Sequence, residues 1–153
     1  MTGKRRKARE MAVQMLYQRD LGGSDLEEIL AGFDPSESSL DEGEEDRPEP
    51  IEPAVFEHAA SLVRGTVEHL EEIDRLIGSQ ADNWRLERMP AVDRNILRLG
   101  VYEFLQQPDV PKLVVIDEAI ELAKRYGSEN SSSFVNGLLD GLVKQHSFPG
   151  SLT

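Results

Sequence analysis

The sequence predicts an all-α fold, a helical bundle of about seven helices in a single domain spanning residues 1–153. Three observations support this. Apolar residues recur at the three- and four-residue spacing of one helix face along most of the chain. No stretch alternates with period two over the length of a strand, except Leu113 to Ile116, whose flanks favour a helix start. The chain length is that of an ordinary domain with one core.

The first predicted helix runs from about Gly3 to Leu21, and Gly22 and Gly23 end it. Its apolar side is formed by Ala8, Met11, Ala12, Met15 and Leu16. A short second helix is expected around Leu26 to Phe33. The following segment, Asp34 to Pro53, is rich in acids and prolines but almost lacks large apolar residues, which is typical of a solvated loop. We interpret this acidic segment as a surface insertion with no chemistry of its own.

The helical period resumes after the acidic segment and predicts five more helices. Their expected ranges are Pro53 to Gly78, Asp82 to Met89, Ala91 to Leu105, Leu113 to Tyr126 and Ser131 to Lys144. Pro53 suits the first turn of a helix, and the helix that it starts should be the longest. Pro90 should end the second of the five, because a residue before proline avoids the helical conformation.

Positive and negative charges are unevenly distributed along the chain. The formal net charge is −12, yet the beginning of the chain is basic and carries no acid before Glu10. The cations at the beginning are Lys4, Arg5, Arg6, Lys7 and Arg9. A compact cationic patch on an acidic body binds phosphate in one place and repels it elsewhere, so a nucleic-acid interface is the first hypothesis. The alternative is a disordered basic start without a function.

A second face of the first predicted helix favours RNA. At about 100° per residue, Tyr17 lies on the side of Arg6 and Arg9, with Gln14 nearby. Guanidinium groups bind phosphates, a tyrosine ring can stack on an unpaired base, and an amide can bond a base edge, which suits single-stranded RNA. The alternative is that Val13 and Tyr17 pack on a second helix and leave only the arginines exposed.

The sequence offers no support for catalysis. It contains no cysteine, which excludes disulfides, thiolate metal sites and cysteine nucleophiles. His58 and His69 are separated by about 16 Å along one predicted helix, too far to share a metal ion. The segment from Gly127 to Ser133 lacks the spacing and the lysine of a phosphate-binding loop, and better fits a helix stop followed by serine capping. We therefore predict no enzyme, cofactor, metal or small-molecule substrate.

Localisation follows from what the chain lacks. No apolar run reaches the length of about 18 to 20 residues that a membrane span needs. The basic start leads into an amphipathic stretch and not into the apolar core of a signal peptide. We expect a cytoplasmic protein that does not contact a membrane.

Several blocks of sequence carry a family pattern. They are RRKAREMAVQMLY at 5–17, VDRNILRLGVYE at 92–103, DVP at 109–111, IDEAIELAKRYG at 116–127 and FVNGLLD at 134–140. In this order and with these gaps, they closely resemble the NusB family of bacterial transcription antitermination factors, from about Lys4 to Lys144. The acidic segment Asp34 to Pro53 is the visible departure, since it is longer and more charged than the usual connection between the second and third helices.

The resemblance implies a helical bundle of two subdomains that binds boxA RNA of ribosomal RNA leader transcripts. It would bind together with NusE, a ribosomal protein of the small subunit, in the antitermination complex on RNA polymerase. The family's RNA-contacting residues correspond to Lys4, Arg5, Arg6, Lys7, Arg9, Gln14, Tyr17 and Phe134. The residues of its NusE surface correspond to Glu87, Arg88, Asp93, Asn130 and Phe134. A core role for Phe134 is the alternative, and Asn130 stands where an acid is common in relatives.

Two alternatives stay open. The chain could be an interaction module that binds a protein and never RNA, its basic start being incidental. It could also be a stand-alone relative of the helical domain that precedes the methyltransferase domain of some ribosomal RNA cytosine methyltransferases. In that case we expect no catalysis in this chain, because no α/β domain follows before Thr153.

Overall fold

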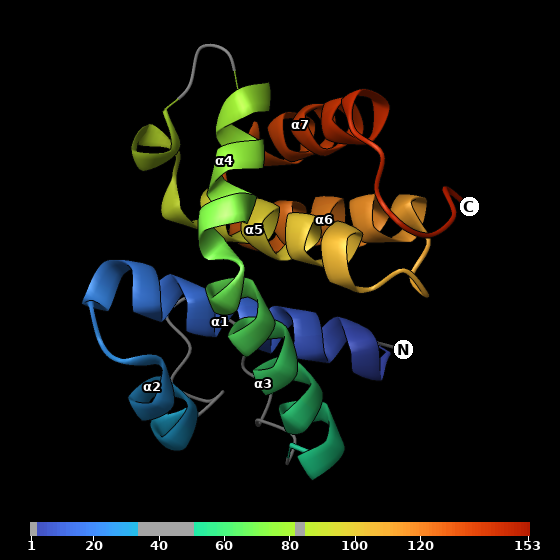
Figure 1. The fold of residues 1–153 in the computed structure, drawn as a ribbon. Helices are drawn as coiled ribbons and strands as arrows, with labels where there is room; N and C mark the ends of the chain where they lie inside the picture. Colours follow the sequence, from blue (N-terminus) through green and yellow to red (C-terminus); the bar gives the residue numbers. More distant parts are fainter. Residues whose placement is uncertain (1–2, 34–50, 82–84) are drawn as a thin grey trace.

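The computed structural model describes residues 3–33, 51–81 and 85–153 and confirms the all-α fold. The described residues form seven α-helices and one short 3₁₀-helix, without strands (Figure 1). The α-helices are α1 (Lys4–Gly22), α2 (Leu26–Gly32), α3 (Pro53–Glu68), α4 (Leu70–Gln80), α5 (Ala91–Gln106), α6 (Lys112–Tyr126) and α7 (Ser131–Gln145). The 3₁₀-helix is η2 (Leu86–Arg88). The predicted acidic insertion at 34–53 lies outside the described residues, except for its last three positions.

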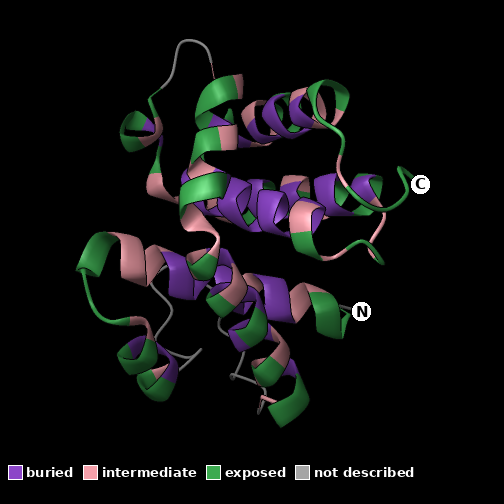
Figure 2. Cartoon of the chain, viewed as in Figure 1, coloured by how far each residue is buried: buried purple, intermediate pink, exposed green. Residues whose placement is uncertain are grey.

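The helices form two groups that meet along α1 and α5. In Figure 1, α1, α2 and α3 occupy the lower half, whereas α4, α5, α6 and α7 occupy the upper half. α1 packs on α3 within its own group and on α5 of the other group. Figure 2 shows that buried residues concentrate on the helices along this boundary and between α5, α6 and α7. The two groups therefore share one hydrophobic core.

The predicted helix from Pro53 to Gly78 is wrong in one respect, because the structure divides it at His69 into α3 and α4. The backbone N–H of His69 still donates to Gly65 O at 3.1 Å, and Ile73 N–H donates to His69 O at 3.0 Å. The chain thus bends while it keeps backbone hydrogen bonds on both sides. The bend lets α3 pack on α1 while α4 packs on α5 and α7. The apolar period continues through the bend, so the period alone does not reveal it.

The predicted helix from Asp82 to Met89 is also wrong, since its described part contains only η2. Arg85 and Met89 are extended on either side of η2, with ψ of 141° and 145°. Pro90 follows directly and disfavours the helical conformation at Met89. The Met89 side chain is buried, so this segment is an ordered connection between α4 and α5.

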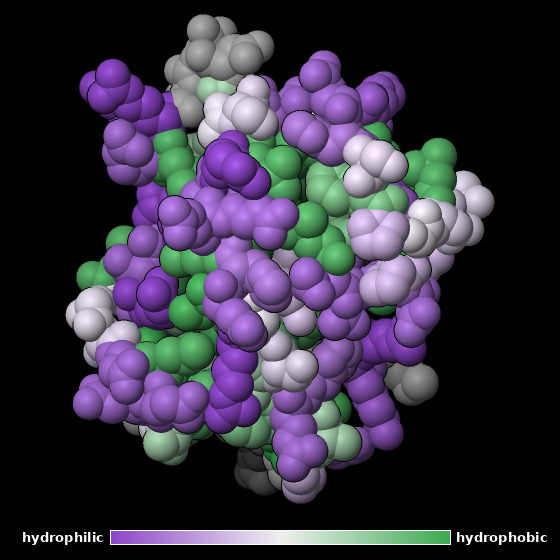
Figure 3. Space-filling view, viewed as in Figure 1, coloured by the Kyte–Doolittle hydropathy of each residue, from purple (hydrophilic) through white to green (hydrophobic). Residues whose placement is uncertain are grey.

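Two further features are the polarity of the surface and the length and apolar character of the described helices. Figure 3 shows a mostly hydrophilic face in which apolar side chains are scattered in small groups. Among the described helices, none combines the length and the apolar character that crossing a bilayer requires.

Gly65 permits close packing between α3 and α5. A Cβ atom added to Gly65 would overlap the ring of Tyr102, which is itself buried. The ring of Tyr102 also stacks on His69, with ring centroids 6.2 Å apart. Gly137 in α7 is different, because a Cβ there would meet no other atom within 4 Å.

We therefore expect Gly65→Ala to lower the free energy of unfolding by roughly 1 to 3 kcal/mol, the usual cost of overpacking. The matched variant Gly137→Ala should raise it by about 0.5 to 1 kcal/mol, because alanine is the better helix former. Urea denaturation of both variants measures the difference. Equal responses would show that the Tyr102 ring moves aside without cost.

Candidate nucleic-acid interface

The predicted cations lie in the first turns of α1, but they differ in exposure. Lys4 and Arg5 are exposed, whereas Arg6 and Lys7 are half-buried. Lys4 Nζ lies 3.1 Å from Glu52 Oε2, and both side chains are mostly exposed, so this pair is weak. The first turn of α1 contains no acid, and the positive end of the helix dipole adds to the local positive charge. This end of α1 is suited to phosphate.

Arg6 is held by Glu118 of α6. Arg6 Nε donates to Glu118 Oε2 and Arg6 Nη2 donates to Glu118 Oε1, both at 2.9 Å. The hydrogen bond from Arg6 lowers the pKa of Glu118, and it prevails over partial burial, which acts in the opposite direction. The Arg6 side chain remains 41% exposed. The guanidinium therefore takes part in the fold and is also accessible from solvent.

The expectation that Arg9 belongs to the solvent-facing cluster is wrong, since Arg9 is only 5% exposed. Arg9 Nη2 lies 2.8 Å from Glu103 Oε1, and Arg9 Nε donates to the same oxygen at 3.0 Å. Burial raises the pKa of Glu103, although the hydrogen bond and charge of Arg9 oppose the rise. The sequence pattern missed this because it does not show that α5 supplies a buried acid opposite Arg9.

Gln14 and Tyr17 are less accessible than the helix face predicted. Gln14 is 7% exposed, and its Oε1 accepts no hydrogen bond from the described residues. Val13 is fully buried, and Tyr17 is half-buried. The packing alternative is thus correct for Val13, whereas the contact of Gln14 with a base edge stays a prediction for a side chain that is buried in this structure. Only the Tyr17 side chain keeps partial access to solvent.

His58 of α3, which was considered above only as a metal ligand, lies close enough to the basic cluster to feel its charge. It is half-buried. Burial first, and then the positive charges of Arg9 and Arg5, lower the pKa of His58. The imidazole is therefore neutral near pH 7 and adds no further charge to this region. The sequence alone does not reveal this neighbour, because His58 approaches the basic cluster only when α3 packs on α1.

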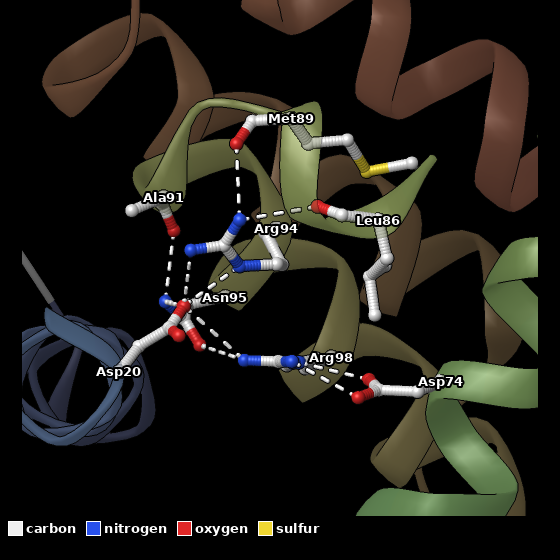
Figure 4. A network of polar contacts seen from close by, with 8 residues as sticks. All are labelled: Asp20, Asp74, Leu86, Met89, Ala91, Arg94, Asn95 and Arg98. Atoms are coloured by element: carbon white, nitrogen blue, oxygen red, sulfur yellow. Dashed lines mark hydrogen bonds and ion pairs between the residues drawn. The ribbon is translucent and has the colours of Figure 1, made fainter. Parts of the chain in front are cut away.

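The other end of α1 is fixed by a polar network around Asp20 (Figure 4). Three residues of α5 donate to Asp20 Oδ2, namely Arg94 Nε at 2.7 Å, Asn95 Nδ2 at 3.0 Å and Arg98 Nη1 at 3.3 Å. Burial alone would raise the pKa of Asp20, but hydrogen bonds from Arg94 and Asn95 and the charge of Arg98 outweigh it and lower the pKa.

The same two arginines extend the network to α4 and η2. Arg98 donates from Nε and Nη2 to the two carboxylate oxygens of Asp74, each at 2.9 Å. Arg94 Nη1 donates to the backbone carbonyls of Leu86 and Met89, each at 3.1 Å. The network thus joins α1, α4, η2 and α5. Polar residues spaced along one side of a largely apolar helix were the signal in the sequence.

The expected partner residues do not all reach the surface. Glu87, Arg88 and Asn130 are exposed, and Phe134 is half-buried and packs against the core. Asp93 is 4% exposed, so the expectation that it receives a partner directly is wrong.

Asp93 instead joins the starts of α5 and α7. Its Oδ1 accepts a hydrogen bond from Ser131 Oγ at 2.7 Å. Ser131 Oγ also accepts the backbone N–H of Ser128 at 2.9 Å. The predicted serine capping is therefore wrong, because the N-cap residue is Asn130 and its side chain makes no cap bond. Ser131 instead holds the preceding turn together. Asp93 thereby ties the first turn of α7, which follows the exposed Asn130, to the start of α5.

Comparisons with known proteins bear on this surface. A model described as the NusB family matches residues 6–144. A relative from Anaeromyxobacter dehalogenans, "Transcription antitermination protein NusB", is 47% identical over 92% of this chain and 90% of its own length. A relative of the same name from Sorangium cellulosum is 44% identical over 93% of both chains.

Solved structures agree with these relatives. NusB from T. maritima has a TM-score of 0.78 and 40% identity, covering 95% of this chain and 94% of that one. A structure of antitermination factors NusB and NusE in complex with dsRNA contains a chain with a TM-score of 0.73 and 30% identity. That match covers 95% of this chain and all of the other.

The network around Asp20 should dominate stability. We expect Asp20→Ala to lower the free energy of unfolding by roughly 2 to 4 kcal/mol, because two mostly buried arginines lose a shared carboxylate. The control is Asp140→Ala, which breaks the exposed 2.8 Å pair with Lys144 and should change the free energy of unfolding far less than Asp20→Ala does. Chemical denaturation measures both, and similar losses would contradict this role of Asp20.

The lowered pKa of Asp20 also predicts acid sensitivity. In the unfolded chain the Asp20 carboxyl takes up a proton near its ordinary pKa of 3.8, whereas the folded protein resists protonation to lower pH. The stabilisation by Asp20 is thus present above about pH 5 and is lost as the pH falls toward the lowered pKa. Denaturation curves between about pH 7 and 3 should show a shallower acid dependence for Asp20→Asn, and an unchanged dependence would rule out this contribution.

Proposed function

This chain belongs to the NusB family, and we infer from this that it is a transcription antitermination protein that binds RNA together with NusE. Its RNA target is the boxA element of ribosomal RNA leader transcripts, and it acts within the antitermination complex on RNA polymerase. Its activity is binding and not catalysis. The observation that carries the proposal is the family match over residues 6–144, which includes most of the basic start of α1.

The proposed RNA surface is the start of α1. Lys4, Arg5, Arg6 and Lys7 supply cations at a helix N-terminus, which favours phosphate contacts. Tyr17 and Phe134 are half-buried, so each can offer a ring edge or face to a base without leaving its packing site. We assign the buried Arg9 and Gln14 a supporting role, in which they hold α1 in place below the contacting residues.

The proposed NusE surface comprises η2 and the start of α7, which are both bound by residues at the start of α5. Glu87 and Arg88 of η2 and Asn130 at the N-cap of α7 are exposed. Arg94 of α5 donates to the Leu86 carbonyl of η2, and Asp93 of α5 accepts from Ser131 of α7. We assign Phe134 to this surface and also to the RNA surface, as the family resemblance implies. The net charge of −12 favours the approach of a basic ribosomal protein.

The whole chain is proposed to act as one RNA-binding domain in the cytoplasm, where bacterial transcription takes place. A protein-only interaction module remains the competing function. The two functions differ in one measurable property. Only a protein that contacts RNA phosphates has an RNA affinity whose logarithm falls linearly with the logarithm of the salt concentration.

Arg5→Ala should weaken binding of a boxA-like single-stranded RNA roughly fivefold near 0.1 M salt, and should reduce the salt slope by about 0.7. Arg5 is exposed, so the melting temperature should not change. The matched control is Arg75→Ala, since Arg75 is an exposed arginine of α4, and RNA affinity should then stay near that of the parent. Arg9 is left intact because its loss would leave the buried carboxylate of Glu103 without its ion-pair partner.

Fluorescence anisotropy titrations across a salt series measure these affinities, and co-purification with NusE checks the partner surface. NusE binding should be the same in both variants. An absence of saturable RNA binding by the parent, with NusE binding retained, would favour the protein-only module.

A further inference from the structure

One carboxylate occupies the part of Arg6 that a phosphate would use. Glu118 reaches Arg6 from α6, which lies 112 residues further along the chain. Its two oxygens accept from Nε and Nη2 of the guanidinium at equal distances of 2.9 Å. This two-bond geometry is the one in which arginine also binds a phosphate oxygen pair. An RNA phosphate and the Glu118 carboxylate therefore compete for the same N–H donors of Arg6.

The surroundings of Arg6 reinforce this competition. Glu10 and Glu121 also act on Arg6 through their charges. Arg125 of α6 pairs with Glu10 at 3.2 Å, which draws the acid of α1 toward α6. Arg5, the preceding residue, is exposed instead. The two adjacent arginines therefore differ: the guanidinium of Arg5 is accessible to phosphate, whereas that of Arg6 is bound by the carboxylate of Glu118.

We propose that Glu118 is an internal competitor for RNA phosphate, which occupies the Nε and Nη2 edge of Arg6 and lowers the affinity of α1 for RNA. This inference rests on the proposed function, because it concerns the same RNA surface. An RNA that makes several contacts at once can displace Glu118, whereas a chance contact with one phosphate cannot. Glu118 therefore suppresses non-specific binding more than it suppresses binding to a cognate site.

Exposure allows this exchange to take place. The Arg6 and Glu118 side chains are 41% and 18% exposed, in contrast to the Arg9 and Glu103 pair at 6% and 4%. A half-exposed pair is solvated and separates at modest cost, while a buried pair does not. Of these two pairs, only the Arg6 pair can thus open without disturbing the core.

Salt dependence gives the proposal a distinct signature. Arg6 is already paired with a carboxylate, and a phosphate must displace that carboxylate in order to bind. The contact between Arg6 and the phosphate therefore contributes little to the net release of counterions. Removing the carboxylate should make Arg6 a full phosphate contact. The slope of log affinity against log salt should then steepen by about 0.7 for single-stranded RNA.

The test uses Glu118→Gln in the full chain, with polyuridine of about twelve nucleotides as a non-specific probe. Its affinity near 0.1 M salt should rise about three- to tenfold, with the steeper slope given above. The matched control is Glu121→Gln, one turn along α6, which removes the same charge from a side chain paired with Lys124 at 3.7 Å. That variant should change affinity less than about twofold, since its charge acts on Arg6 only through space.

A second pair of variants shows whether Glu118 acts through Arg6. Arg6→Ala and the double variant Arg6→Ala, Glu118→Gln should bind polyuridine equally, because the edge for which Glu118 competes is then gone. Melting curves establish that every variant is folded at the temperature of the titration, and Glu118→Asp, which shortens the reach of the acid, replaces Glu118→Gln if that variant is unfolded.

The proposal is overturned if Glu118→Gln binds polyuridine no better than the parent or than Glu121→Gln. It is also overturned if the gain persists without Arg6, which would mean general charge repulsion. If Arg5→Ala weakens RNA binding while Glu118→Gln has no effect, only this inference fails. If Arg5→Ala and Arg75→Ala both bind as the parent does, the RNA surface itself is misplaced.

Discussion

The shared carboxylate of Asp20 is the interaction on which the arrangement of the helices depends. Every residue of α5 from Asp93 to Phe104 is buried, although four of them carry charges. Buried charges are tolerated only when they have polar partners, and here each has a partner on another helix. Arg94 and Arg98 meet Asp20 of α1, Glu103 meets Arg9 of α1, and Asp93 meets Ser131 of α7. A rotation of α5 that kept its apolar contacts would still separate these pairs, so they define one orientation where apolar packing alone would allow several.

The pairs also explain how one helix can be both core and binding surface. α1 is covered along its middle, where every residue from Ala8 to Leu16 except Glu10 is buried, and it is anchored there by Arg9 and near its end by Asp20. The first turn lies beyond both anchors and stays accessible. A rigid helix that projects cations from a fixed base loses less entropy on binding phosphate than a flexible basic tail does. The buried charges therefore support the proposed RNA surface, and this role requires no contact between them and RNA.

The sequence predicted the helices well where period and boundaries agreed, as in α1, α5, α6 and α7. It failed at His69 because the apolar period runs through the bend, whose position depends on packing against α1 and α5. It correctly placed the basic residues in the first turns of a helix, whereas the segments of the partner surface stay a prediction. It could not separate exposed from buried members, because Arg5 and Arg9 are equally basic and only the position of Glu103 on another helix distinguishes them. Asp93 was misjudged for the same reason, since Ser131 lies 38 residues away.

The distance in sequence between paired residues has a consequence during synthesis on the ribosome. Asp20 is separated from Arg94, Asn95 and Arg98 by 74 to 78 residues, and Arg6 from Glu118 by 112. The N-terminal helices therefore leave the ribosome long before their charged partners are translated, and α1 cannot settle until α5 emerges. Its basic first turn is uncovered throughout that interval, and Glu118 reaches Arg6 only when α6 has been made. The nascent chain should thus attract RNA more strongly than the finished protein does.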